Sequence, residues 1–207
     1  MPEPPWGLIG QETAVGRLRE GLESGRLPHG VLLAGPEGVG KATAALRVAA
    51  GLLCAEGPAV EPCGKCPPCR HFESGTAPDL IRVAAEPGEE IRIDTVREQT
   101  RHLYLTPQES GARVVVMDPA EAMNAYAANA LLKALEEPPG SAFFLLVSHR
   151  PGRLPPTIRS RCQTFSFSRC THSCIFTSST CSLWSSARYV EFESFLGLPS
   201  FFAMAAS

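Results

Sequence analysis

The hydrophobic residues of this chain gather in short continuous runs that are separated by stretches of helical period. A run of apolar residues without alternation is typical of a strand that is buried on both faces of a parallel sheet. Such runs predict buried strands at Val31–Ala34, Arg113–Asp118 and Phe143–Ser148, and two further short strands are predicted at Leu80–Val83 and Gln163–Phe167.

Between these runs, apolar residues recur every three or four positions, which is the period of an amphipathic helix. In the first such stretch, Ala14, Leu18 and Leu22 share one face. Strands that alternate with helices predict an α/β fold of three layers, in which helices cover both faces of a parallel sheet. The predicted helices are Gln11–Ser24, Ala42–Leu53, Asp94–Leu105 with Asp94 as its N-cap, Glu121–Glu137, and a short turn at Pro155–Arg159.

The segment 54–77 interrupts the alternation, since it is rich in Cys, Pro and Gly and shows no periodicity. Its cysteines have the spacing C-x8-C-x2-C-x2-C, and a C-x-x-C pair places two thiolates on one turn, aimed at a single tetrahedral ion. Four thiolates without a histidine favour structural Zn²⁺, with an iron–sulfur cluster, disulfides or unpaired thiols as alternatives. The ligands of this predicted inserted zinc module are Cys54, Cys63, Cys66 and Cys69.

The pattern changes again after Arg169, so we predict one nucleotide-binding-type domain over residues 1–169 and an irregular tail over residues 170–207. The tail is crowded with Ser, Thr, Cys and Phe and has neither helical nor strand period, and we do not assign a fold to it. We expect that it is not the natural continuation of the domain, for example because of a reading-frame shift or a chimeric end. Its potential metal ligands fit no zinc pattern: Cys170, His172, Cys174 and Cys181.

The composition is that of a globular protein without a dominant charge. Hydrophobic residues make up 44% and charged residues 19% of the 207 residues, and the net charge of −2 provides no basic field that would draw the whole chain to nucleic acid. The N-terminus does not resemble a signal or transit peptide, and no apolar run is long enough to cross a bilayer. We therefore expect a cytoplasmic protein with no membrane partner, in which thiols bind metal or stay free rather than form disulfides.

The stretch from Val31 to Thr43 has the form of a phosphate-binding loop. The spacing G-x-x-x-x-G-K follows a predicted strand and precedes a predicted helix, as such a loop requires. Its glycines turn backbone N–H groups toward an anion, the helix N-terminus adds partial positive charge, and Lys41 can reach the outer phosphates of ATP or ADP. The alternative is a Gly-rich turn without a ligand. The predicted binding residues of the loop are Gly35, Pro36, Glu37, Gly38, Val39, Gly40, Lys41 and Ala42.

Two features on the hydrolytic side of this site are lost. The residue after Lys41 should carry a hydroxyl for Mg²⁺, but it is Ala42, and Thr43 is rotated away by about 100° on a helix. The next strand should end in Asp-Glu, and here Asp118 is followed by Pro119 where the catalytic base would stand. Glu121 lies in the next predicted helix and is a poor substitute. We therefore expect weak or absent nucleotide binding and no activation of water.

Arg161 lies in the sequence Ser160-Arg161-Cys162, between a predicted helical turn and the last predicted strand. A guanidinium at the edge of a domain can reach a phosphate held by another subunit. Taken alone, the position is more often that of an ordinary surface arginine.

Five sequence stretches of this chain occur together in an order that is specific to one protein family. Over about residues 6–169 the chain resembles the bacterial clamp-loader ATPase subunits of the AAA+ class, which serve DNA polymerase III. The stretches that carry the resemblance are Ile9–Glu12, Leu27–His29, the four-cysteine insertion, Asn129–Pro139 and Leu154–Cys162.

The two losses indicate a stationary scaffold within this family rather than a motor. The resemblance then implies an arginine finger, Arg161, that acts in trans on the nucleotide of an adjacent motor subunit, and a sensor position at Ser148. It also implies no polymerase chemistry in this chain, and partners that comprise the motor subunits, the delta subunit, the sliding clamp and, through the complex, primer-template DNA. The helical lid and collar domains of the family are not recognisable after Arg169. The alternatives are an active motor subunit and a zinc-stabilised nucleotide-binding protein unrelated to replication.

Overall fold

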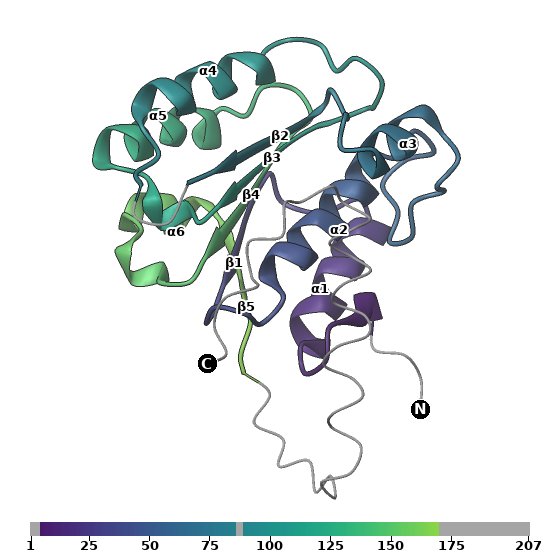
Figure 1. The fold of residues 1–207 in the computed structure, drawn as a ribbon, viewed down its shortest axis with the longest axis horizontal. Helices are drawn as coiled ribbons and strands as arrows, with labels where there is room; N and C mark the ends of the chain where they lie inside the picture. Colours follow the sequence, from purple (N-terminus) through teal and green to yellow (C-terminus); the bar gives the residue numbers. More distant parts are fainter. Residues whose placement is uncertain (1–4, 86–88, 170–207) are drawn as a thin grey trace, which may run out of the picture.

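Five parallel strands form one sheet in the order β2-β3-β4-β1-β5 (Figure 1). The computed structural model describes residues 5–85 and 89–169. Because all strand pairs are parallel, each connection between strands runs from the carboxyl end of one strand back to the amino edge of the sheet. The carboxyl ends of all five strands therefore lie at one edge. The strands are β1 (Gly30–Ala34), β2 (Leu80–Ala84), β3 (Arg113–Asp118), β4 (Ala142–Ser148) and β5 (Gln163–Ser166).

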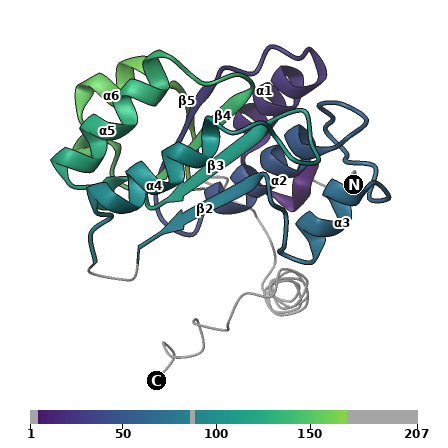
Figure 2. The ribbon, with the colours of Figure 1, turned by 90° about the horizontal axis from the view of Figure 1, so that it is seen from above.

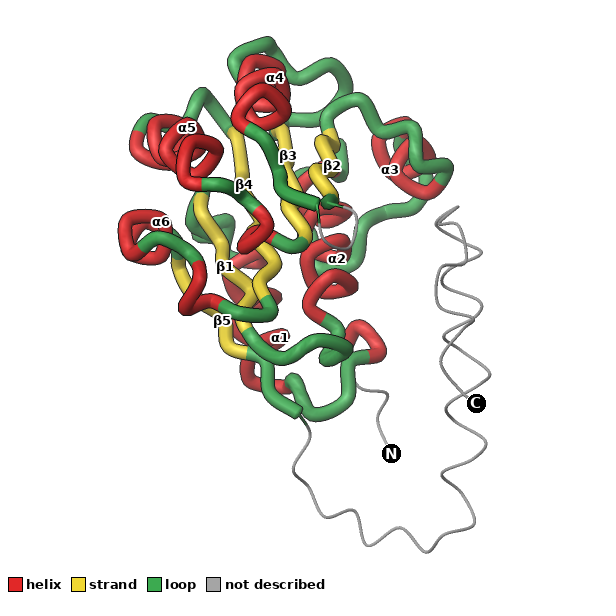
Figure 3. Tube along the Cα trace, turned by 60° about the vertical axis from the view of Figure 1, so that its left-hand side comes forward, coloured by secondary structure: helices red, strands yellow, loops and turns green. Residues whose placement is uncertain are grey.

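Helices cover both faces of this sheet, which confirms the predicted three-layer α/β fold (Figures 1 and 3). Helices α1 (Glu12–Glu23) and α2 (Lys41–Leu53) pack on one face, and α4 (Ile93–Leu103), α5 (Ala125–Glu136) and α6 (Pro156–Arg161) pack on the other. Alternate strand residues enter two separate cores: Leu33 faces the α1–α2 side, while Leu32 and Leu146 face the α4–α5 side. Both cores consist mainly of buried aliphatic side chains, with Phe165 in the first and Phe144 in the second.

The insertion after α2 contains a short helix, α3 (Pro67–Glu73), which lies beside the end of α2 (Figure 2). The sequence of the insertion, which shows no periodicity, gave no sign of this helix. Pro67 and Pro68 occupy the first two helical positions, where a missing N–H is no loss. A helix of seven residues is too short to show a hydrophobic period.

The helix predicted from Glu121 begins later than expected. Glu121 lies in a separate 3-10 turn, η2 (Ala120–Ala122), and α5 starts at Ala125 because Asn124 caps it: its Oδ1 accepts a hydrogen bond of 2.8 Å from the N–H of Ala127. The N-cap predicted for the preceding helix is also displaced. Arg92 occupies the cap position of α4, and Asp94 stands in its first turn.

The remaining short elements are the 3-10 turns η1 (Pro5–Gly7) and η3 (Pro151–Arg153). Within residues 5–85 and 89–169, none of the helices has both the length and the apolar character that crossing a bilayer requires. The predictions for the tail 170–207, including its cysteines and His172, lie outside the described residues.

Candidate functional site

The loop between β1 and α2 holds the backbone conformation that its sequence requires. Gly38 and Gly40 have φ values of +78° and +89°, which side chains rarely tolerate. A Cβ on Gly40 would lie 2.4 Å from Cδ2 of Leu8, and one on Gly35 would lie 2.1 Å from the carbonyl oxygen of Phe167. Segments from both ends of the domain therefore pack closely against Gly35 and Gly40, and a side chain at either position would clash.

Lys41 begins α2 and is buried, with 3% of its surface exposed. Its ammonium donates a hydrogen bond to the carbonyl oxygen of Pro36 in the loop. Burial lowers the pKa of Lys41, and the negative charges of Asp118, Glu121 and Glu37 oppose this shift. The charged head of Lys41 is thus directed into the loop, where a phosphate would meet it.

The carboxyl edge of the sheet brings three predicted residues together. Ser148 is fully buried at the end of β4, and its carbonyl oxygen accepts a hydrogen bond of 3.2 Å from the N–H of Gly35. Asp118 ends β3, with Nε2 of His149 at 3.8 Å from its Oδ1. Burial raises the pKa of Asp118, an effect that His149 and Lys41 oppose. The glycine-rich loop, Asp118 and Ser148 therefore lie together at this edge, as the predicted nucleotide site requires.

Among the described residues, the two positions expected to bind Mg²⁺ and to activate water carry no suitable side chain. Pro119 follows Asp118, and Ala42 offers a methyl group where a hydroxyl would bind Mg²⁺. The Oε1 atom of Glu121 accepts hydrogen bonds from the backbone N–H groups of His149 and Arg150, at 2.8 and 3.0 Å. Although burial raises the pKa of Glu121, the hydrogen bonds that it accepts outweigh burial and lower it. The ionised carboxylate of Glu121 thus holds the backbone of His149 and Arg150, directly after β4, in place.

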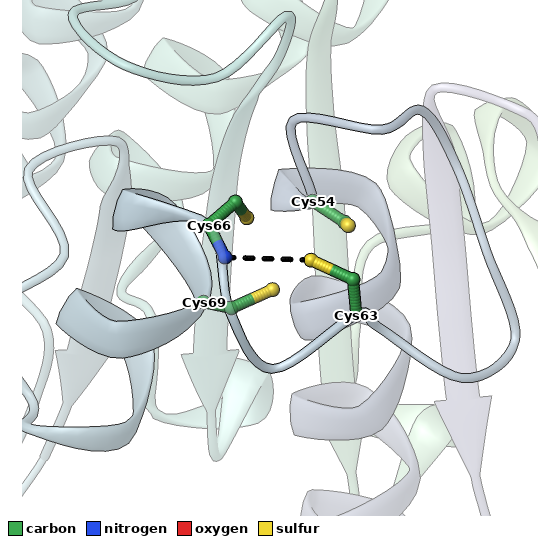
Figure 4. Close-up of side chains that lie close together, drawn as sticks. All are labelled: Cys54, Cys63, Cys66 and Cys69. Atoms are coloured by element: carbon green, nitrogen blue, oxygen red, sulfur yellow. Dashed lines mark hydrogen bonds between the residues drawn. The ribbon is translucent and has the colours of Figure 1, made fainter.

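The four predicted metal ligands converge in the insertion, and all four thiols point toward one another (Figure 4). Their sulfur atoms all lie within 4.8 Å of one another. Around a tetrahedral Zn²⁺ with bonds of about 2.3 Å, sulfur atoms are about 3.8 Å apart, so the cluster has the size and donor set for such an ion. The insertion can therefore hold a metal. The candidate ligands are Cys54 after α2, Cys63 in the following loop, and Cys66 and Cys69 at the start of α3.

The insertion is fixed to the body of the domain through α2. Gly51 lies so close to the loop that an added Cβ would be 2.2 Å from the carbonyl oxygen of Ala59, and the N–H of Ala59 donates a 3.2 Å hydrogen bond to the Gly51 carbonyl. Val60 is buried in the core on this side, and Phe72 packs against that core. The cysteine cluster and Lys41 thus lie at opposite ends of one helix of 13 residues.

Arg161 lies at the opposite edge of the sheet from the phosphate loop. It ends α6, two residues before β5, and β5 runs parallel to β1 with Gln163 beside Val31. Its guanidinium forms an ion pair with Glu136 at the end of α5, and Nη1 donates a 3.2 Å hydrogen bond to the carbonyl of Thr157. Strands of four to five residues separate the two edges, which is on the order of 15 Å. Arg161 therefore does not belong to the site of its own loop.

A groove of about 460 Å³ runs between α4 and α5 on the outer face. Three cationic side chains line it, together with two exposed tyrosines, of which Tyr126 is 72% and Tyr104 62% exposed. Cations next to exposed rings form a surface suited to polyanions such as nucleic acid. The cations are Arg97, Arg101 and Lys133.

Comparison with known proteins establishes the relationship of this domain. The model of the family described as DNA polymerase III, delta subunit, matches residues 10–171. The chain belongs to this family. The match covers the phosphate loop, the cysteine cluster and Arg161, so these features are all part of the family's domain.

Within the family, the chain resembles the delta′ type. It is 49% identical over 135 residues to the DNA polymerase III subunit delta′ of Pseudomonas aeruginosa, covering 65% of this chain and 41% of that protein. The tau subunit of Escherichia coli is 37% identical over 158 residues, covering 76% of this chain and 24% of that protein. The chain thus spans less than half the length of these curated relatives.

A solved structure supports the fold. The gamma subunit-related protein of DNA polymerase III from Thermotoga maritima superimposes with a TM-score of 0.52 at 26% identity, covering 74% of this chain and 45% of that one. The chain is a delta′-like member of the family with the AAA+ type of P-loop domain.

Three residues of this domain have contacts that sequence reasoning did not identify. Gln11 is buried and exchanges two hydrogen bonds with the backbone of Ser168, which joins the first helix to the exit of β5. His149 lies beside Asp118, and Glu136 pairs with Arg161. Gln11 and Glu136 stand in stretches that carry the family resemblance, whereas His149 had no sequence signal; all three contacts join segments that are far apart in the chain.

Proposed function

We propose that this domain is a scaffold, not a motor, of a bacterial DNA polymerase III clamp loader. In this role it supports the motor subunits while the sliding clamp is loaded onto primer-template DNA, and it supplies Arg161 to the nucleotide site of a neighbouring motor subunit. The delta subunit is a further partner in the complex. Fingers of this kind contribute on the order of 10³–10⁵ in rate in GTPase systems.

One observation carries the proposal: the two chemical elements of the domain lie on opposite edges of one sheet. The phosphate loop at the carboxyl edge lacks a hydroxyl after Lys41 and a base after Asp118. Arg161 at the amino edge is partly exposed, at 37% of its side chain, and too distant to serve its own loop. A domain of this kind can contribute to hydrolysis only at a site on another subunit.

The first test compares ATP hydrolysis by the purified full-length subunit with that of its Lys41→Ala variant. We expect both to be at background, because neither the metal nor the water would be held in place. Steady-state turnover that Lys41→Ala abolishes would favour the runner-up, an active motor subunit like gamma or tau.

The second test concerns the finger. In a loader reconstituted with motor subunits, Arg161→Ala should lower the kcat of ATP hydrolysis by at least tenfold while the complex still assembles on gel filtration. Arg159→Ala, which removes another exposed arginine of α6, is the matched control. Unchanged hydrolysis with Arg161→Ala would remove the finger from the proposal.

We further propose that the four cysteines hold one structural Zn²⁺. Thiolate ligands without a histidine suit Zn²⁺, and the close approach of all four sulfur atoms leaves no position for substrate. Metal analysis of protein purified without chelators should yield one equivalent of zinc per chain. An iron content of two or four equivalents with a visible absorption band would instead indicate a cluster.

A further inference from the structure

The structure joins two sequence motifs that the chain separates by about two dozen residues. Glu136 belongs to the stretch Asn129–Pro139 at the end of α5, and Arg161 belongs to Leu154–Cys162 at the end of α6. Their side chains form an ion pair at the amino edge of the sheet, away from the phosphate loop.

The backbone around this pair is closely packed. A Cβ on Gly30, the first residue of β1, would lie 3.0 Å from the carbonyl oxygen of Arg161 and 3.3 Å from Cδ2 of Leu135. The start of β1, the end of α5 and the end of α6 therefore meet at one point. Because Leu135 precedes Glu136, the same contact determines where the carboxylate lies relative to Arg161.

The guanidinium itself is only partly restrained. An arginine head has five N–H donors, of which one contacts Glu136 and one the carbonyl of Thr157, leaving three for another acceptor. The side chain remains 37% exposed, so a partner can reach it. Without these two contacts, a long side chain on a well-fixed backbone would sample many rotamers.

We infer that Glu136 is a positioning residue for the arginine finger. Its carboxylate holds one side of the guanidinium of Arg161, so that the remaining donors are already in place when a neighbouring nucleotide arrives. This inference rests on the proposed finger role of Arg161. Of the two consecutive glutamates Glu136 and Glu137, only Glu136 would hold the arginine.

The test uses the full-length subunit in a loader reconstituted with motor subunits, and Glu136→Gln as the variant. An exposed ion pair is a weak interaction, so we expect kcat for ATP hydrolysis to fall about two- to fivefold with the KM for ATP unchanged. Glu136→Asp should recover part of the loss. Glu137→Gln is the matched control, because this neighbouring exposed glutamate forms no ion pair with any of the described residues, and it should behave like the unaltered protein.

The double variant Glu136→Gln/Arg161→Ala distinguishes positioning from a general structural effect. It should hydrolyse ATP at the same rate as Arg161→Ala alone, since Glu136 acts only through that arginine. The melting temperature of the isolated subunit should not change with Glu136→Gln, because 47% of the Glu136 side chain is exposed.

The outcomes separate the two proposals. If Arg161→Ala lowers kcat but Glu136→Gln leaves it unchanged or raises it, the positioning role is wrong and the finger stands. If Arg161→Ala itself has no effect on kcat, both the finger role of Arg161 and the positioning role of Glu136 are wrong.

Discussion

At the scale of single residues, a buried carboxylate organises the loop between α4 and β3. Asp79 is only 2% exposed, and the guanidinium of Arg113, 4% exposed, lies with its Nε atom 3.7 Å from Oδ1 of Asp79. Arg113 also donates hydrogen bonds of 2.7 and 2.8 Å to the carbonyl groups of His102 and Thr106. The carboxylate of Asp79 accepts hydrogen bonds from three backbone N–H groups of the loop, those of Gln108, Glu109 and Ser110.

These contacts make the stability of the domain depend on the charge of Asp79. Burial raises the pKa of Asp79, but the hydrogen bonds that it accepts outweigh burial, so the pKa is lowered from its ordinary value of 3.8. A carboxyl whose pKa is lower in the folded state stabilises the fold fully above its unfolded pKa. That stabilisation is lost as the pH falls through the folded pKa.

We therefore predict that Asp79→Asn lowers the free energy of unfolding by about 3 kcal/mol at pH 7, because it leaves the charge of Arg113 buried without its partner. The difference between the variant and the unaltered protein should shrink as the pH falls from 5 to 2. Urea unfolding at several pH values measures it. Asp94→Asn, at an exposed aspartate in the first turn of α4, should change the free energy by less than about 0.5 kcal/mol. A constant difference across this pH range would contradict the assignment.

At the scale of elements, α2 is the connection between the phosphate loop and the cysteine cluster. The helix begins at Lys41 and ends directly before Cys54. Gly51 permits the loop of the insertion to approach the helix within hydrogen-bonding distance. The position of the cluster thus depends on a residue without a side chain.

Gly51→Ala should separate the insertion from α2. The new methyl group would overlap the carbonyl of Ala59, and overpacking of this kind costs about 1–3 kcal/mol. We expect a lower melting temperature and faster loss of bound metal to a chromogenic chelator. Gly16→Ala on α1 is the control, because a Cβ there meets open space and should leave stability equal or slightly higher. Equal metal retention in both variants would show that α2 does not hold the insertion in place.

Elements with a clear period were predictable from the sequence, and those formed by local capping or distant pairing were not. The predicted strand Arg113–Asp118 has the same first and last residue as β3, because a continuous apolar run favours a buried strand over its whole length. The start of α5 was missed because the cap at Asn124 overrode the helix-favouring residues before it. Lys41, Asp118 and Ser148 were expected from motifs, and the parallel sheet brings them together. The contact of Arg161 with Glu136 joins residues far apart in sequence and required the packing of three elements.

At the scale of the whole molecule, charge is distributed unevenly. The net charge is −2, yet Arg97, Arg101 and Lys133 line one groove between α4 and α5. Local concentration of cations, rather than overall charge, is what an anionic partner would meet. On the proposed function, this groove is a candidate surface for contact with DNA in the assembled loader.

Arg97→Ala together with Arg101→Ala should weaken binding of the reconstituted loader to primer-template DNA. The slope of log Kd against log salt should fall by roughly one for each phosphate that the variant no longer neutralises. Arg26→Ala with Lys65→Ala also removes two exposed positive charges, but from other surfaces, and should leave the slope unchanged. Fluorescence anisotropy over a salt series measures both. Equal weakening in the two double variants would mean that net charge, not the groove, governs binding.

The parallel direction of all five strands has a consequence for assembly. Since the phosphate loop and Arg161 lie at opposite ends of the strands, domains that join arginine to loop form a row with two unlike termini. A subunit that supplies an arginine finger but does not hydrolyse ATP needs no finger from a neighbour. It therefore fits the terminus of the row at which no arginine faces its loop. On the proposed function, strand polarity alone would then dictate which place in the arc this subunit occupies.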